Sequence, residues 1–155
     1  DVLDVRLAMG LGGKAFCLLS GDVGAVKMAI EAGAAGAAKG GLLVRQVVIA
    51  EEVARYAVRV VDATRPAQSG SPDFVRKYVK WGAGLRASQA IVLGAKARAV
   101  MRGRYHVSVA DVRAMALPAL RHRVVTNFYA ESEQLTSDTI VSRLLELVPQ
   151  PRSNM

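Results

Sequence analysis

Cysteine, histidine and long apolar runs are scarce in this sequence. Its 155 residues include one cysteine, Cys17, which excludes an internal disulfide. Cys17 lies in an apolar, strand-like run, and we expect a reduced, buried residue of a bacterial cytoplasmic protein rather than a nucleophile. The two histidines, His106 and His122, are not at metal-ligand spacing and have no cysteine partners, which argues against a metal site. No apolar run approaches the roughly 20 residues that span a bilayer, and we find no signal-peptide pattern.

Aromatic residues are also few, at 5%, so we expect a core built mainly from Ala, Val and Leu. The charge is one-sided: residues 51–155 hold sixteen Lys and Arg against nine Asp and Glu, which leaves this part at +7. Such an excess indicates an acidic partner (nucleotide phosphate, nucleic acid or an acidic protein face) or a solvated basic surface. Nucleic acid is not favoured, because Trp81, Tyr105 and Tyr129 are too scattered to form a stacking surface.

The first fifty residues have the pattern of a β-β-α-β half-domain. The segments DVRLAM and KAFCLLS flank the glycine-rich MGLGG, which suits a hairpin whose tip needs positive φ. Asp22 is placed to cap a helix that continues to about Lys39. LLVRQVVIA, residues 42–50, then predicts a further strand, and we expect the first domain to cover residues 1–50.

Residues 51–155 predict a small helical bundle with a short β-ribbon, so the chain as a whole is α+β. Ser108 with Asp111 forms a capping-box signature, Thr136 caps the last helix, and Gly103 is a plausible C-cap. We expect the strand-like segment 124–128 to pair with residues 105–109. The expected helices cover residues 51–65, 85–103, 109–123 and 137–148, with a loop over 66–72 and a helical or irregular lead-in over 73–82.

The glycine-rich GLGGKA, residues 10–15, does not make a phosphate-binding loop. That motif requires a glycine where this chain has Ala8, and a Ser or Thr where it has Ala15. A strand-like segment follows it instead of a helix, and no acidic strand end suited to Mg²⁺ is visible. We therefore expect no ATPase activity from this chain alone, although it can still be part of an enzyme.

Arg86, in WGAGLRAS, is the better candidate for binding chemistry. It is predicted to lie in the first turn of a helix, where the partial positive charge of the helix end disfavours a cation. A bound phosphate would remove that conflict, because a guanidinium and a helix N-terminus both attract anions. A solvated surface position is the alternative. Arg121, His122 and Arg123 lie at a predicted helix C-terminus, where the dipole alone accounts for their charge.

Residues from about 51 to 152 resemble the C-terminal lid of MoxR-type AAA+ ATPases. The resemblance is carried by VRKYVKWGAGLRASQAIVLGAKARAVMRGRYHVSVADVRAMALPALRHRV and by the trailing T-x-x-x-I-V-S-R-L-L-E-L-V-P. It implies that Arg86 is the sensor 2 arginine, which reaches the nucleotide held by a preceding ATPase core. It also implies ATP and Mg²⁺ as cofactors only once such a core is supplied. The core or neighbouring subunits would then be the partners.

Residues 1–50 resemble the second half of a bacterial microcompartment shell domain. The resemblance is carried by SGDVGAVKMAIEAGAAGA and LVRQVVIA. MGLGG falls where such domains place the loop that lines the pore of a hexamer, which implies pore-loop roles for Gly10, Leu11, Gly12 and Gly13. The first strand and first helix of that family have no counterpart in these residues.

Three hypotheses follow from these patterns. The first is a nucleotide-responsive lid, from a chaperone or remodelling ATPase, fused to a partial shell-like module. The second is a microcompartment shell or assembly protein whose helical bundle docks cargo or a remodeller, and it leaves a homo-oligomer and microcompartment association open. The third is a chimera without integrated function, because the two patterns meet at residues 50 and 51 without a linker.

Overall fold

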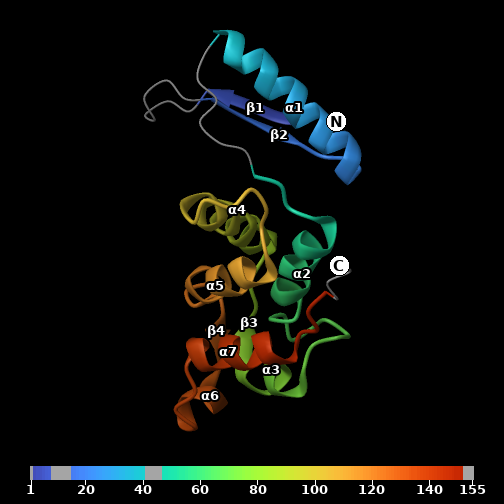
Figure 1. Cartoon of the computed structure of the whole chain (residues 1–155). Coiled ribbons are helices and arrows are strands. Elements are labelled where there is room, and N and C mark those ends of the chain that lie inside the picture. Colours follow the sequence, from blue (N-terminus) through green and yellow to red (C-terminus); the bar gives the residue numbers. More distant parts are fainter. Residues whose placement is uncertain (1, 8–14, 41–46, 152–155) are drawn as a thin grey trace. The chain divides into compact units, whose positions relative to one another are not determined.

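The computed structural model describes residues 2–7, 15–40 and 47–151 and divides into two compact units (Figure 1). The first unit is Asp1–Gln46 and the second is Val47–Met155. This division falls four residues before the boundary that we expect from the sequence. Val47 and Ile49 pack against the helical core of the second unit, so these residues belong with it.

The N-terminal unit contains an antiparallel strand pair and one helix. Strand β1 (Val2–Leu7) pairs with β2 (Ala15–Leu19), and the register places Leu7 opposite Ala15. Helix α1 (Val23–Gly40) follows, and Asp22 Oδ2 accepts a hydrogen bond of 2.9 Å from the backbone N–H of Gly24. The expected hairpin and helix cap are confirmed.

Two expectations for the first fifty residues are corrected. Cys17 is exposed rather than buried, because it lies in a two-stranded antiparallel sheet, one face of which can remain solvated. The strand expected over residues 42–50 is described only from Val47 onward. There Val48 makes a parallel bridge to His106, because the backbone of Val48 is hydrogen-bonded to Tyr105 and Val107.

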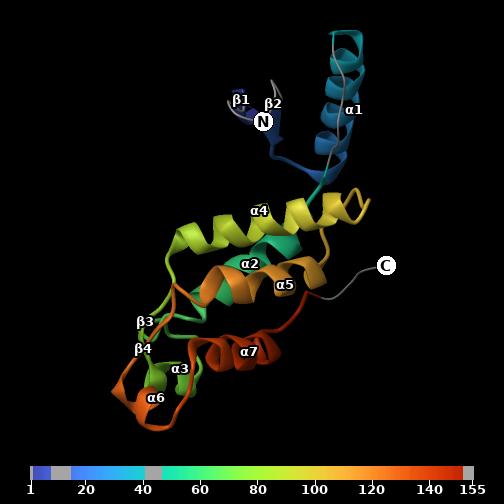
Figure 2. The same cartoon turned by 90° about the vertical axis from the view of Figure 1, so that its left-hand side faces the viewer.

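The second unit is a helical bundle with a two-stranded ribbon, as the sequence predicts. Figures 1 and 2 both show α4, α5 and α7 stacked in that order, with α2 beside α4 and α5. Small and β-branched side chains fill the core, together with Tyr56, Phe74 and Tyr78. The elements are α2 (Glu51–Asp62), α3 (Asp73–Tyr78), β3 (Val79–Trp81), α4 (Leu85–Met101), α5 (Val109–Leu120), β4 (Val125–Thr126), α6 (Phe128–Ser132) and α7 (Ser137–Leu147).

The helix ends have the caps that the sequence predicts. Ser108 and Asp111 form the capping box of α5, and Thr136 Oγ1 accepts from the Thr139 N–H at 3.2 Å. Gly103 has φ of +70°, a conformation that favours glycine, and its N–H bonds to the Val100 carbonyl at the end of α4. Helix α2 stops at Asp62, three residues earlier than expected.

The partner of the ribbon strand is corrected. The segment 124–128 pairs with β3, where Val79 lies opposite Thr126 and Trp81 opposite Val125, and not with residues 105–109. The N–H of Val107 instead donates to the Val48 carbonyl at 2.9 Å, so it is not available to pair with the segment 124–128. The short α6 was not expected. Among the residues that the structure describes, no helix is long and apolar enough to cross a membrane.

Candidate functional site

The turn before α4 is fixed by buried hydrogen bonds to the segment that follows α2. The N–H of Ala83 donates to Thr64 Oγ1 at 2.9 Å, and that hydroxyl donates to the Val61 carbonyl at 2.6 Å. Arg65 Nε donates to the Ala83 carbonyl at 2.8 Å. Thr64 and Ala83 are both 1% exposed, so water does not compete for these bonds. The start of α4 is therefore held at a defined position on the bundle.

Gly82 is required by the same close approach. A Cβ atom at this residue would lie 2.4 Å from the Thr64 carbonyl oxygen and 2.6 Å from its carbonyl carbon. Both contacts are with backbone, which cannot move aside as the end of a side chain could. Gly84, in the same turn, has open space at its Cβ position.

We expect Gly82→Ala to lower the free energy of unfolding by about 2 kcal/mol, within the range for steric overpacking. Urea denaturation followed by circular dichroism measures this loss. Gly84→Ala is the matched control and should change stability much less. Equal stabilities for the two variants would contradict the close approach of Thr64 to the turn.

Arg86 is the second residue of α4, and its side chain is exposed. Gly84, the N-cap, has no side chain to accept from the N–H groups of the first turn, and that turn has no acidic residue. The Arg86 side chain makes no hydrogen bond or ion pair with any described residue. An anchored helix N-terminus with an unpaired guanidinium favours an anion from outside these residues.

A shallow groove lies between α2 and α4, next to this helix start. Its lining is mostly apolar, with residues Glu51, Ala54, Arg55, Val58, Ser88, Gln89 and Val92. Gln89 follows Arg86 by three residues, so the two are neighbours on α4. The Ser88 hydroxyl oxygen is buried and has no hydrogen-bond partner among the described residues. The face of α4 beside Arg86 therefore has one unused polar group and an apolar surface.

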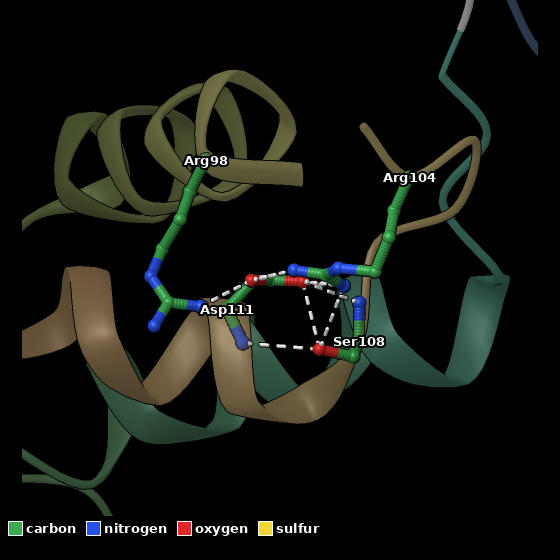
Figure 3. A network of polar contacts seen from close by, with 4 residues as sticks. All are labelled: Arg98, Arg104, Ser108 and Asp111. Carbon is green, nitrogen blue, oxygen red and sulfur yellow. Dashed lines mark hydrogen bonds and ion pairs between the residues drawn. The ribbon is translucent and has the colours of Figure 1, made fainter. Parts of the chain in front are cut away.

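Asp111 is the centre of a network of polar contacts with Arg98, Arg104 and Ser108 (Figure 3). Its carboxylate is fully buried and accepts two hydrogen bonds of 2.6 Å from Arg104, one to each oxygen. Arg98 binds the same carboxylate from α4, and Ser108 donates through its N–H at 2.9 Å and its hydroxyl at 2.7 Å. These donors, chiefly Arg104, hold the pKa of Asp111 well below its usual range against the effect of burial.

This cluster stabilises the loop between α4 and α5 and does not form a site for a ligand. The Asp111 carboxylate accepts from three residues, which fills its accepting positions. Arg104 is followed at once by Tyr105, whose carbonyl accepts from the Val48 N–H at 2.9 Å. The segment before α2 is thereby tied to the loop between α4 and α5.

The other candidates from the sequence are the glycine-rich loop, Arg121 and a metal site. Gly10, Leu11, Gly12 and Gly13 lie outside the described residues, so their pore-loop roles stay predictions. Arg121 pairs with Asp138 at 2.8 Å, which joins the end of α5 to α7. In the described ranges 2–7, 15–40 and 47–151, no group of three or more His, Cys, Asp or Glu could hold a metal ion.

Sequence reasoning missed the residues that anchor the turn, Thr64 and Arg65. They lie 19 and 18 residues before Ala83, respectively, in a segment that looks like an ordinary helix end and loop. No short motif joins them to WGAGLRAS. Gly82 becomes a signal only once β3 is known, since a glycine next to a short strand indicates close approach of another backbone and the sequence predicts a helical or irregular segment there.

Two known families match different parts of the chain, and the fold also divides the chain into two units. Residues 74–144 match the AAA lid domain. Residues 1–52 match the BMC domain. The resemblance of each part to its family is therefore confirmed, and the anchored turn with Arg86 lies inside the lid match.

Two proteins are similar to this chain over about two thirds of its length. The chain is 39% identical over 100 residues to the chaperone MoxR1 of Mycobacterium tuberculosis (strain ATCC 25618 / H37Rv), a match that covers 64% of this chain and 26% of that protein. It is also similar to the crystal structure of a protein from Cytophaga hutchinsonii ATCC 33406 that is named as an ATPase. That structure matches with a TM-score of 0.64 and 31% identity, over 69% of this chain and 32% of that one. The chain thus spans about a third or less of each relative.

Proposed function

We propose that the helical unit is the lid of a MoxR-type AAA+ chaperone or remodelling ATPase, with Arg86 as its sensor 2 arginine. The observation that carries this proposal is the exposed, unpaired Arg86 at the N-terminus of a helix that is anchored by buried hydrogen bonds. The identity to the chaperone MoxR1 supports the family, and the geometry of the turn supports the role.

In this role Arg86 would face a nucleotide phosphate. Its guanidinium offers a fork of donors that matches phosphate oxygens, and the N-terminus of α4 adds attraction for negative charge. Such a preorganised cation stabilises charge that develops during phosphoryl transfer. Because Ala83 is bonded to Thr64 and Arg65, a movement of Arg86 toward or away from the phosphate would carry the bundle with it.

The nucleotide itself needs residues that these 155 do not supply. GLGGKA does not match a phosphate loop, so ATP and Mg²⁺ would bind on an AAA+ core, either elsewhere in a longer protein or on a neighbouring subunit. The core is then the main partner of this unit.

We propose for the N-terminal unit the role of a fused, partial shell-type module. The match of residues 1–52 to the BMC domain and the antiparallel β1–β2 pair followed by α1 favour this assignment. Among the described residues its strand pair has edges that another strand can complete, which favours self-association. A shell or assembly role with the bundle as a docking element is the second candidate.

A graft tests the lid assignment. Residues 47–155 would replace the lid of MoxR1, and phosphate release from ATP would be compared for the graft, the MoxR1 core without a lid, and this chain alone. We expect turnover from the graft, much less from the core without a lid, and none from this chain. A graft no more active than the core without a lid would contradict the lid assignment, and so would turnover by the purified chain alone.

A further inference from the structure

Helix α1 is covered only in part by the other described residues of the N-terminal unit. None of its described side chains is buried, and Val26, Ile30 and Ala34, four residues apart on one face, are half-buried. A Cβ atom at Gly33 or Gly36 would meet no described atom within 4 Å beyond the backbone of its own helix. Glycines weaken a helix interior, so α1 depends on packing that the described part of its unit supplies only on one side.

The strand pair of the same unit is also incomplete. Among the described residues β1 and β2 form a sheet of two strands, which is marginal in water until further strands or a well-packed helix cover it. A pocket of about 140 Å³ separates the strand ends from the first turns of α1 and is lined by Val2, Leu19, Val26 and Ala29. The described part of this unit therefore lacks a layer of apolar side chains.

The residues that could supply this layer are held by the helical unit. The match to the BMC domain extends to residue 52, and LLVRQVVIA, residues 42–50, has the apolar pattern of a strand. The fold nevertheless assigns Val47 and the residues after it to the helical unit. Residues 47–50, which we call the junction segment, thus belong to one unit by family and to the other by their contacts.

The attachment of the junction segment to the helical unit is limited. The Val48 N–H donates to the Tyr105 carbonyl, and the Val48 carbonyl accepts from the Val107 N–H, both at 2.9 Å. Val47 and Ile49 pack against the helical core, but every residue of the segment remains half-buried. Backbone hydrogen bonds of this kind contribute little net free energy, because water replaces them on release. The segment can therefore leave the bundle without unfolding the buried core.

We propose that the junction segment is a strand for which the two units compete. The helical unit holds it in this structure. Released from Tyr105 and Val107, it adds a third strand to the β1–β2 sheet and supplies apolar cover for α1. It serves one unit at a time, because the face with its larger side chains, Val47 and Ile49, can pack against only one core. Completion of the first unit and attachment of the second are thereby coupled, independently of Arg86 and of any nucleotide.

A chain that carries the strand twice tests the proposal. Residues 42–50 are repeated after Ala50, with a flexible Gly/Ser linker between the copies, so that each unit can have one. Hydrogen exchange followed by mass spectrometry compares this chain with the unmodified one. We expect amide exchange in β2 and α1 to become about tenfold slower or more, because a third strand stabilises both against local opening. Exchange in α4 and α5 should not change, since the second copy keeps the bonds to Tyr105 and Val107.

The matched control has the same repeat with Val47→Pro/Val48→Pro in the first copy only. Successive N–H groups of a strand point to opposite edges, so the two prolines prevent pairing on either edge. Exchange in β2 and α1 should return to the rate of the unmodified chain. The proposal is overturned if the intact repeat leaves that exchange unchanged, or if the repeat with prolines slows it equally.

A substitution in the helical unit tests the same competition without any change in the junction segment. Val107→Pro removes the N–H that donates to the Val48 carbonyl, so exchange in β2 and α1 should become slower in the single-copy chain. Val109→Pro is its control, because Val109 is the first residue of α5, a position that favours proline. A bundle loosened by Val107→Pro also releases the segment, so the expected direction stays the same. Equal exchange in the two proline variants would contradict the competition.

Discussion

Arg86→Ala is expected to lower ATP turnover of the grafted ATPase about 100-fold, the typical loss when one preorganised charge donor is removed from a transition state. The fold should not change, because the Arg86 side chain is exposed and makes no hydrogen bond or ion pair with a described residue. The fall should appear mainly in kcat, since a group that acts on developing charge contributes more in the transition state than in the bound ground state. Phosphate release over a range of ATP concentrations separates kcat from KM.

Two further variants make this test specific. Arg102→Ala removes an exposed arginine from the other end of the same helix, and it should retain turnover. Arg86→Lys keeps the charge but loses the planar fork, so it should recover only part of the activity. Turnover of Arg86→Ala equal to that of Arg102→Ala would remove the sensor assignment, even if the graft itself is active. The lid assignment and the role of Arg86 are thereby tested separately.

Much of the bundle could be predicted from the sequence because its signals are local. Ser108 with Asp111, Thr136 and Gly103 act within a few residues, and the structure shows each cap as expected. The ribbon partner could not be predicted in this way. The sequence predicts a helical or irregular segment over residues 73–82 and a strand over 105–109, but Val48 bonds to the latter and β4 pairs with β3 instead.

At the candidate site, too, the local signal could be predicted from the sequence and the long-range contacts could not. Arg86 was visible because a cation at a helix N-terminus contradicts a local rule. Its support was not visible, because Thr64 and Arg65 reach Ala83 across an intervening loop and a short helix. The unpaired hydroxyl of Ser88 also depends on packing between α2 and α4, which the periodicity of one helix cannot show.

Asp111→Asn is expected to lower the free energy of unfolding by about 3 kcal/mol, the low end for removing one partner of a buried ion pair. The substitution keeps the shape of the side chain but leaves Arg98 and Arg104 without their counter-charge. The side chains of these two arginines are only 22% and 29% exposed, so water replaces the carboxylate incompletely. Urea denaturation measures the loss. Asp138→Asn is the matched control, since its pair with Arg121 is about half exposed and should contribute about 1 kcal/mol or less.

The same carboxylate predicts how stability depends on pH. Because Arg104, Ser108 and Arg98 lower the pKa of Asp111 in the folded state, the unfolded chain takes up its proton first, near the ordinary pKa of about 3.9. The contribution of Asp111 is therefore complete above that pH and is lost as the pH falls toward the pKa of the folded state. Between about pH 5 and pH 2 the wild type should lose stability more steeply than Asp111→Asn, which has no carboxyl to titrate there. Parallel curves for the two proteins would show that the buried carboxylate does not stabilise the connection between α4 and α5 through its charge.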